Sequence, residues 1–244
     1  MKIIDIDGIV LNETNYSESS KILNVLTKDL GLIGVMSKGS RNMKSKLNGV
    51  SRKLIYGTFH IYYKENGLST LIGVDVKNTY NNILTDLSKI SYATYLLDLT
   101  KQVLRETDDS SIYDLLISAL DKINDGFDPT VLTNILELKY LDYLGVSPNL
   151  DQCSFCGNSD DIVTLSSSSG GLVCGSCLTD ERLLDIKVIK MIRMYYYVDI
   201  NRITKLDVSD EVKKESNLFL DDYYDRYTGL YLKSREFMKR VTRF

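Results

Sequence analysis

The first eighty residues alternate apolar and polar side chains with a period of two. Three short segments rich in isoleucine, valine and leucine come first, at Ile3–Leu11, Lys21–Thr27 and Gly31–Ser37. After a long polar connection the alternation resumes over Leu54–Tyr63 and, beyond a turn, over Leu68–Lys77. This period is typical of strands with one buried face. Five short strands predict a small closed barrel of the OB type.

The alternation divides the fourth strand into two faces. We expect Phe59, Ile61 and Tyr63 to point into the barrel, because successive side chains of a strand point to opposite sides. The other face then carries the more exposed side chains, which are Tyr56, His60 and Tyr62.

Beyond Asn81 the period changes to about 3.6, which is typical of helices with one apolar stripe. Asp128 and Pro129 have the chemistry of a helix start, and Gly145 that of a helix end. The predicted helical segments are residues 83–104, 111–124, 129–144, 183–197 and 209–231.

All four cysteines lie in one stretch, as Cys-Ser-Phe-Cys and Cys-Gly-Ser-Cys separated by seventeen residues. Two such pairs at this separation are typical of a zinc ribbon. Four thiolates fill a tetrahedral shell and leave no position for an activated water, so we expect one structural Zn²⁺. The predicted ligands are Cys153, Cys156, Cys174 and Cys177.

The alternatives for the cysteines are disulfides, unrelated buried thiols and a redox pair. Disulfides need an oxidising compartment, and the N-terminus has acids at Asp5 and Asp7 and no long apolar core of an export signal. A thioredoxin-like redox motif would have a single Cys-x-x-Cys. We therefore favour zinc and expect a cytoplasmic protein that does not enter a membrane.

Together these patterns predict an α+β protein with three domains. Residues 1–80 form the OB barrel and residues 81–149 with 181–244 form a helical bundle. Residues 150–180 form the zinc ribbon, which is inserted into the bundle.

The charge is unevenly distributed along the chain, although the net charge is only −3. Residues 1–80 carry eleven Lys and Arg against seven Asp and Glu, and residues 81–244 carry nineteen against twenty-six. The segment Leu30–Lys64 has seven basic residues and no acid. This predicts a local cationic surface on an acidic protein.

The basic segment is a candidate nucleic-acid surface, because cations recur every few positions and aromatic side chains follow directly. The alternative is an ordinary solvated loop, which is the commoner origin of a charge run. The candidate DNA-binding residues are Lys38, Arg41, Lys44, Lys46, Arg52, Lys53, Tyr56 and Tyr62.

A second basic cluster lies near the C-terminus and could either extend a binding path or solubilise a final helix. Its members are Lys233, Arg235, Lys239, Arg240 and Arg243. Tyrosines at helical spacing, around residues 195–197 and 223–231, are interpreted as core.

Little in the chain favours catalysis. His60 is the single histidine, and no glycine-rich loop of the P-loop type is present. A nuclease using Asp221, Asp222 and Asp225 is disfavoured, because these helical positions cannot all face one ion. We expect a protein that is not an enzyme.

Several segments, in order along nearly the whole chain, match the sequence pattern of a known protein family. They are Gly8–Leu11, Tyr16–Leu23, Thr27 with Gly31, Lys38–Arg41, Leu141–Gly157 and Leu232–Phe237. With these segments and the four cysteines, the chain resembles the bacterial RecO family of recombination mediator proteins.

The resemblance implies an OB-fold, a helical bundle and an embedded zinc ribbon. It also implies binding of single- and double-stranded DNA, annealing of complementary strands, and loading of RecA together with RecR and the C-terminal tail of the single-stranded-DNA-binding protein. Carried over by position, the family's basic surface falls on Lys38, Arg41, Lys44 and Lys46. The acidic character of residues 81–244 departs from strongly basic members. The competing hypothesis is a zinc-ribbon adaptor that binds proteins and not DNA.

Overall fold

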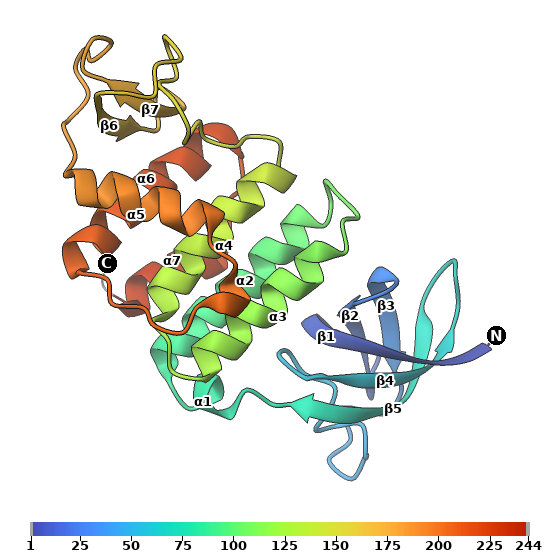
Figure 1. Ribbon diagram of the computed structural model, residues 1–244. Helices are drawn as coiled ribbons and strands as arrows, with labels where there is room; N and C mark the ends of the chain where they lie inside the picture. The colour runs from blue at the N-terminus through green and yellow to red at the C-terminus, as the bar shows by residue number, and fades with distance from the viewer. Residues whose placement is uncertain (1, 243–244) are drawn as a thin grey trace. The chain divides into compact units, whose positions relative to one another are not determined.

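The computed structural model describes residues 2–242 and divides the chain into two compact units (Figure 1). The first unit ends at Asn124 and the second begins at Asp125. The first contains a barrel followed by helices, and the second contains helices and a small two-stranded sheet. The predicted α+β class is confirmed. The predicted domain boundaries at residues 80, 150 and 180 stay a prediction.

The barrel consists of five strands in the order β1-β2-β3-β5-β4. All neighbours are antiparallel except β3 and β5, where Val35 pairs with Ser69 and Met36 with Thr70 in parallel. This short parallel pair closes the barrel, as the OB prediction requires. The strands are β1 (Lys2–Tyr16), β2 (Ser20–Thr27), β3 (Gly31–Ser37), β4 (Tyr56–Tyr63) and β5 (Ser69–Asn78).

Strand β1 is longer than the apolar run of its sequence. Its first half pairs with β4 and its second half, as far as Tyr16, pairs with β2. A bulge between Val10 and Asn12 lies between the two halves. A bulge bends a strand and increases its twist, which lets one strand serve two neighbours around a closed sheet.

The barrel interior is apolar, and the loop between β3 and β4 contributes to it. Phe59 and Ile61 are fully buried, which confirms the predicted inward face of β4. Leu47 and Val50 of the loop pack against the same core. The loop is therefore held to the barrel by burial of its own apolar side chains.

Three helices follow in the first unit: α1 (Asn81–Leu84), α2 (Leu87–Val103) and α3 (Ser111–Asn124). The predicted single stripe over residues 83–104 is interrupted at Asp86, whose carboxylate accepts hydrogen bonds from the backbone of Ser88 and Lys89. Such an N-cap satisfies amide donors that a new helix leaves open. The predicted bounds of α3 are confirmed.

The second unit holds α4 (Pro129–Tyr143), β6 (Ile162–Ser166), β7 (Gly171–Cys174), α5 (Ile186–Tyr197), a 3-10 turn η1 (Ile200–Arg202), α6 (Asp210–Tyr227) and α7 (Lys233–Thr242). The final predicted helix is too long, because α6 ends before Gly229, which has a φ of 62°. Tyr195 and Tyr224 are buried as predicted, whereas Tyr231 is 71% exposed. No helix among residues 2–242 has the length and apolar character needed to cross a membrane.

Gly57 on β4 is a site where the barrel allows no side chain. A Cβ there would lie 2.4 Å from the backbone oxygen of Asp75 and 3.0 Å from the Cα of Val76. We expect Gly57→Ala to lower the free energy of unfolding by about 1–3 kcal/mol, because the strands must move apart. Gly49→Ala is the control, since nothing lies within 4 Å of its Cβ position. Chemical denaturation measures both, and equal stabilities would contradict the prediction.

His60 joins three strands on the outside of the barrel. Its Nδ1 lies 2.7 Å from Asp5 Oδ1 and its Nε2 lies 3.0 Å from Asp75 Oδ2. Hydrogen bonding to Asp5, and then to Asp75, raises the pKa of His60 above 6.5. A raised folded-state pKa stabilises the fold below the unfolded pKa, and this contribution is lost as pH rises through the folded value.

The stability difference between the wild type and His60→Gln should therefore be largest near pH 6 and should shrink by about pH 9. Urea denaturation across this range measures it. A difference that does not change with pH would show that the imidazolium charge contributes nothing.

Candidate nucleic-acid interface and metal centre

The β3–β4 loop is fixed to the barrel by hydrogen bonds at its start. Ser37 and Ser51 are both buried and their hydroxyls lie 2.7 Å apart. The backbone N–H of Arg41 donates to the carbonyl of Ser19, and its guanidinium donates to the carbonyl of Ser17 at 2.8 Å. The loop therefore has a defined course, although its tip is exposed.

The cations of this loop point into solvent. Lys38, Arg41, Lys44, Lys46 and Arg52 are all exposed, and no carboxylate within residues 2–124 forms an ion pair with them. Their positive charge is consequently left uncompensated.

Lys53 differs from the other predicted loop cations. Its ammonium lies 3.8 Å from Asp98 on α2, and its backbone N–H donates to Glu13 at 2.7 Å. Glu13 is also paired with Lys21 at 3.1 Å. Asp98 and Glu13 are thus both engaged at the base of the loop, and neither compensates the cations at its tip.

The two candidate tyrosines lie in different surroundings. Tyr62 is 43% exposed, whereas Tyr56 is half-buried and stacks on Tyr80 with ring centroids 6.5 Å apart. The Lys77 ammonium lies 5.9 Å from the centre of the Tyr56 ring and 2.6 Å from Asp7. Tyr56 is therefore part of a packed, charge-balanced network, and Tyr62 is open.

Strand register places further side chains beside Tyr62. Ile3 and Thr70 pair with it directly, Thr70 pairs with Met36, and Met36 pairs with Ile22. Paired residues share one face of a sheet, so these side chains form a continuous outer belt across the strands. Sequence reasoning missed Met36 and Ile22, because the β3–β5 pairing that connects them to Tyr62 leaves no local signal.

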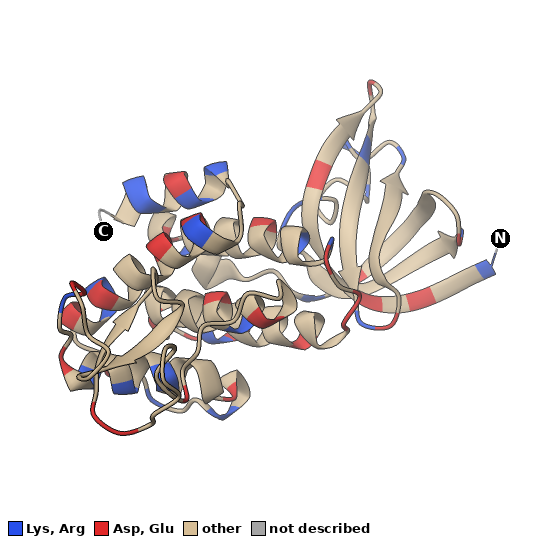
Figure 2. Ribbon diagram, turned by 90° about the horizontal axis from the view of Figure 1, so that it is seen from above, with Lys and Arg blue, Asp and Glu red and all other residues tan. Residues whose placement is uncertain are grey.

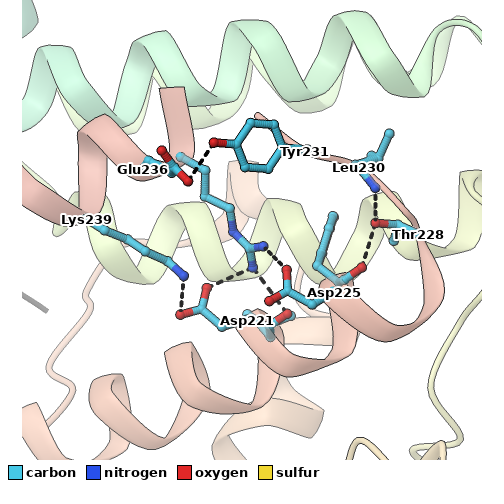
Figure 3. A network of polar contacts seen from close by, with 10 residues as sticks. Asp221, Asp225, Thr228, Leu230, Tyr231, Glu236 and Lys239 are labelled. Carbon is cyan, nitrogen blue, oxygen red and sulfur yellow. Dashed lines mark hydrogen bonds and ion pairs between the residues drawn. The ribbon is translucent and has the colours of Figure 1, made fainter. Parts of the chain in front are cut away.

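The C-terminal basic cluster is neutralised at two of its members, Arg235 and Lys239 (Figure 3). The Arg235 side chain is only 9% exposed and binds Asp221 at 2.8 Å and Asp225 at 3.1 Å. Lys239 also binds Asp221 at 2.8 Å. This network ties α7 to α6 through Arg235, a structural role that neither alternative for the cluster included, and the role of the cluster as a whole stays a prediction. Arg243 lies outside the described residues.

The same ion pairs engage two of the three acids that were considered as ligands of a nuclease metal. Asp221 and Asp225 accept from Arg235, while Asp222 binds Arg226 at 2.8 Å. The hydrogen bond from Arg226 lowers the pKa of Asp222. Figure 2 shows acidic and basic positions side by side on the helices of this unit.

The four cysteines meet at one end of the β6–β7 sheet. Their sulfur atoms all lie within 4.8 Å of one another, and the Sγ atoms of Cys156 and Cys174 are 3.6 Å apart. Four sulfurs at about 2.3 Å from a tetrahedral ion lie roughly 3.8 Å apart, so the cluster can hold a metal ion. Residues 2–242 contain no other group of three or more His, Cys, Asp or Glu arranged to hold an ion.

The knuckles are built by backbone hydrogen bonds around the sulfurs. The N–H of Gly157 donates to the carbonyl of Cys153, and that of Cys177 to the carbonyl of Cys174. Hydrogen bonding from the backbone of Cys156 lowers the pKa of Cys153 to about 6. Hydrogen bonding among the thiols, first with Cys156, raises the pKa of Cys177 to about 12. Crowded sulfurs of this kind resist full deprotonation unless a cation compensates them.

A tight backbone contact supports this small sheet. The N–H of Leu172 donates to the carbonyl of Asn149, and a Cβ at Gly171 would lie 2.3 Å from that carbonyl oxygen. The segment before the first knuckle therefore lies directly against β7. Only glycine allows this approach.

Comparison with known proteins assigns the chain to a family over most of its length. A family model described as "Recombination protein O N terminal" matches residues 1–80, and one described as "Recombination protein O C terminal" matches residues 84–236. The two matches together cover the barrel, helices α2 to α6 and the four-cysteine cluster.

Similar curated proteins are named DNA repair protein RecO. The protein of Listeria monocytogenes serotype 4b is 35% identical over 98% of this chain and 94% of its own length. Those of Bacillus pumilus and Halalkalibacterium halodurans are 34% and 33% identical, over 98% and 96% of this chain and 94% of their own lengths. The chain therefore belongs to the RecO family of DNA repair and recombination proteins.

Proposed function

We propose that this protein binds single- and double-stranded DNA through the β3–β4 loop, anneals complementary strands and helps to load RecA on coated DNA. The observation that carries the proposal is the set of five exposed loop cations without a paired carboxylate in residues 2–124. DNA phosphates would supply the missing negative charge, and the release of their counterions would drive binding.

The size of this effect can be estimated from the number of free cations. If each displaces a counterion fraction of about 0.7 from a single strand, five cations give a log–log salt slope of roughly −3.5. Affinity would then fall about 130-fold between 50 and 200 mM salt. Lys53 is left out of this sum because Asp98 already pairs with it.

Unpaired bases require a second kind of contact, which the outer belt around Tyr62 offers. Base–aromatic stacking contributes about 1–3 kcal/mol per base and tolerates any sequence. We propose Tyr62 as the main stacking residue and give Tyr56 a smaller part, because its ring already packs against Tyr80.

The partners proposed for this mediator are RecR, the C-terminal tail of the single-stranded-DNA-binding protein and, indirectly, RecA. Family membership supports them. We also propose that the protein acts in the cytoplasm at the nucleoid and without catalysis of its own. The alternative is an adaptor whose helices and four-cysteine hairpin bind proteins while the loop cations stay solvated.

We propose that the four-cysteine cluster holds one structural Zn²⁺. The donor set supports this, because four thiolates at tetrahedral spacing suit zinc and leave no open position for chemistry. When bound, the ion would compensate the thiolates and hold the two knuckles together. Cys153, Cys156, Cys174 and Cys177 would be its ligands.

The loop proposal predicts a change in salt dependence. Changing Lys38, Arg41, Lys44 and Lys46 to alanine should reduce the contribution of the loop to the salt slope for single-stranded DNA from roughly −3.5 to about −0.7. Filter binding across a salt series measures it. A matched control changes four basic residues elsewhere in the same unit, Lys28, Lys89, Lys101 and Arg105, to alanine.

The same variants separate the mediator from the adaptor. The loop variant should anneal complementary strands coated by the cognate single-stranded-DNA-binding protein much more slowly than the control variant does. Equal annealing by the two variants, or a wild-type salt slope near zero, would refute DNA binding through this loop.

The metal proposal predicts about one zinc per chain in freshly purified, reduced protein. Structural zinc contributes on the order of 10 kcal/mol to a small metal domain, so chelation or Cys156→Ala should unfold the β6–β7 region. Hydrogen exchange of the β6 and β7 amides reports this loss. Ser176→Ala, at an exposed position in the second knuckle, is the control. Elemental analysis that finds no zinc would contradict the assignment.

A further inference from the structure

Helix α5 is basic, although the second unit to which it belongs is acidic. Residues 125–244 carry fifteen Lys and Arg against nineteen Asp and Glu, so this part of the chain is acidic. The twelve residues of α5, however, include Lys187, Lys190 and Arg193 and no acid. The helix is therefore a local positive feature on an acidic unit.

The solvent side of α5 is also unusually apolar. Val188, Ile189, Ile192 and Tyr195 form its buried face. On the other side, positions 186, 190, 194 and 197 follow one another at the spacing that places residues on one helical face. The three large apolar side chains of this face are Ile186, Met194 and Tyr197, with exposed fractions of 49%, 43% and 55%.

Lys187, Lys190 and Arg193 form no ion pair with the carboxylates of Asp142 and Asp151. Asp151 accepts from the Tyr197 hydroxyl at 2.5 Å, and Asp142 accepts from the Tyr196 hydroxyl at 2.7 Å.

The acids that flank the helix ends have partners of their own. Asp185 caps the helix through the N–H of Lys187 at 2.8 Å, and Asp199 pairs with Arg202 at 3.4 Å. None of the ion pairs formed within residues 125–242 involves the Lys187 ammonium, the Lys190 ammonium or the Arg193 guanidinium. The three cations are available to an anionic ligand.

Tyr197 adds a surface for stacking. Its hydroxyl is held by Asp151, and its ring contacts Tyr196 edge to face with centroids 5.0 Å apart. A ring that is held in place and more than half exposed is a platform that any base can stack on. The distance from Lys187 to Arg193 along the helix is about 9 Å, the rise of two or three nucleotides.

We propose that the exposed face of α5 is a second binding site for single-stranded nucleic acid, separate from the β3–β4 loop. Lys187, Lys190 and Arg193 contact phosphates, and Tyr197 with Met194 contacts bases. This inference rests on the proposed DNA-binding function and extends it. One chain with a strand site in each unit can hold two strands at once, which is what annealing requires.

The test counts the short strands that one full-length chain binds. A thymidine oligonucleotide of about eight nucleotides is longer than the two or three nucleotides that the α5 cations span and lies within the range of about 4–16 nucleotides that one OB-fold binds. Fluorescence titration should give two oligonucleotides per wild-type chain and one per chain of the Lys187→Ala, Lys190→Ala, Arg193→Ala variant. The control changes three other exposed cations of the same unit, Arg202, Lys205 and Lys214, to alanine and should still bind two.

Two further variants distinguish stacking from charge alone. Tyr197→Ala should weaken the second binding event about 5- to 160-fold, because one stacked base contributes about 1–3 kcal/mol. Tyr197→Phe keeps the ring and should weaken it much less. All of these positions are at least partly exposed, and circular dichroism checks that each variant is folded.

The outcomes separate this inference from the proposed function. Two oligonucleotides bound by the α5 triple variant, or one bound by the wild type, overturn the α5 site and leave the loop site intact. No binding by the wild type overturns both. An acidic peptide that binds wild-type α5, with no oligonucleotide bound there, also overturns the inference and identifies a protein partner for this face.

Discussion

The closure of the barrel by the short parallel pairing of β3 and β5 is the constraint on which the proposed DNA surface depends. Because β3 is hydrogen-bonded on both edges, the chain leaves it at Ser37 and must cross an end of the barrel before β4 begins. Leu47 and Val50 are partly buried in that crossing and pack against the barrel core, and buried serines hold its ends. A loop anchored this way can expose a dense set of cations without losing its course.

Local charge balance, rather than net charge, decides which cations are available. Six of the basic side chains described in the second unit form ion pairs, and Arg235 is the extreme case, buried between two aspartates. Among residues 2–242, the five exposed loop cations and the three cations of α5 form no such ion pair. A protein with a net charge of −3 can therefore present two cationic surfaces, because screening by salt limits the influence of distant charges.

The four-cysteine hairpin is a different arrangement, because it brings together four sulfurs at a spacing that can hold a metal ion. The hairpin is small, and its close contact with Asn149 depends on the absence of a side chain at Gly171. A hairpin of this size has little apolar core of its own. The structural metal proposed for it would therefore fix the two knuckles.

Much of the architecture was decided locally by the sequence. Alternation over β4 determined that Phe59 and Ile61 point into the barrel. Helical periodicity determined the bounds of α3 and α4 to within about one residue. Both succeeded because side-chain burial follows the backbone period. The spacing of the cysteines likewise determined that four sulfurs meet. What the sequence could not show was contact between distant residues. Only the tertiary structure placed Thr70 between Met36 and Tyr62, neutralised Arg235 with Asp221, and packed Tyr56 against Tyr80. These outcomes depend on strand pairing and ion pairing across the fold, which no local period encodes.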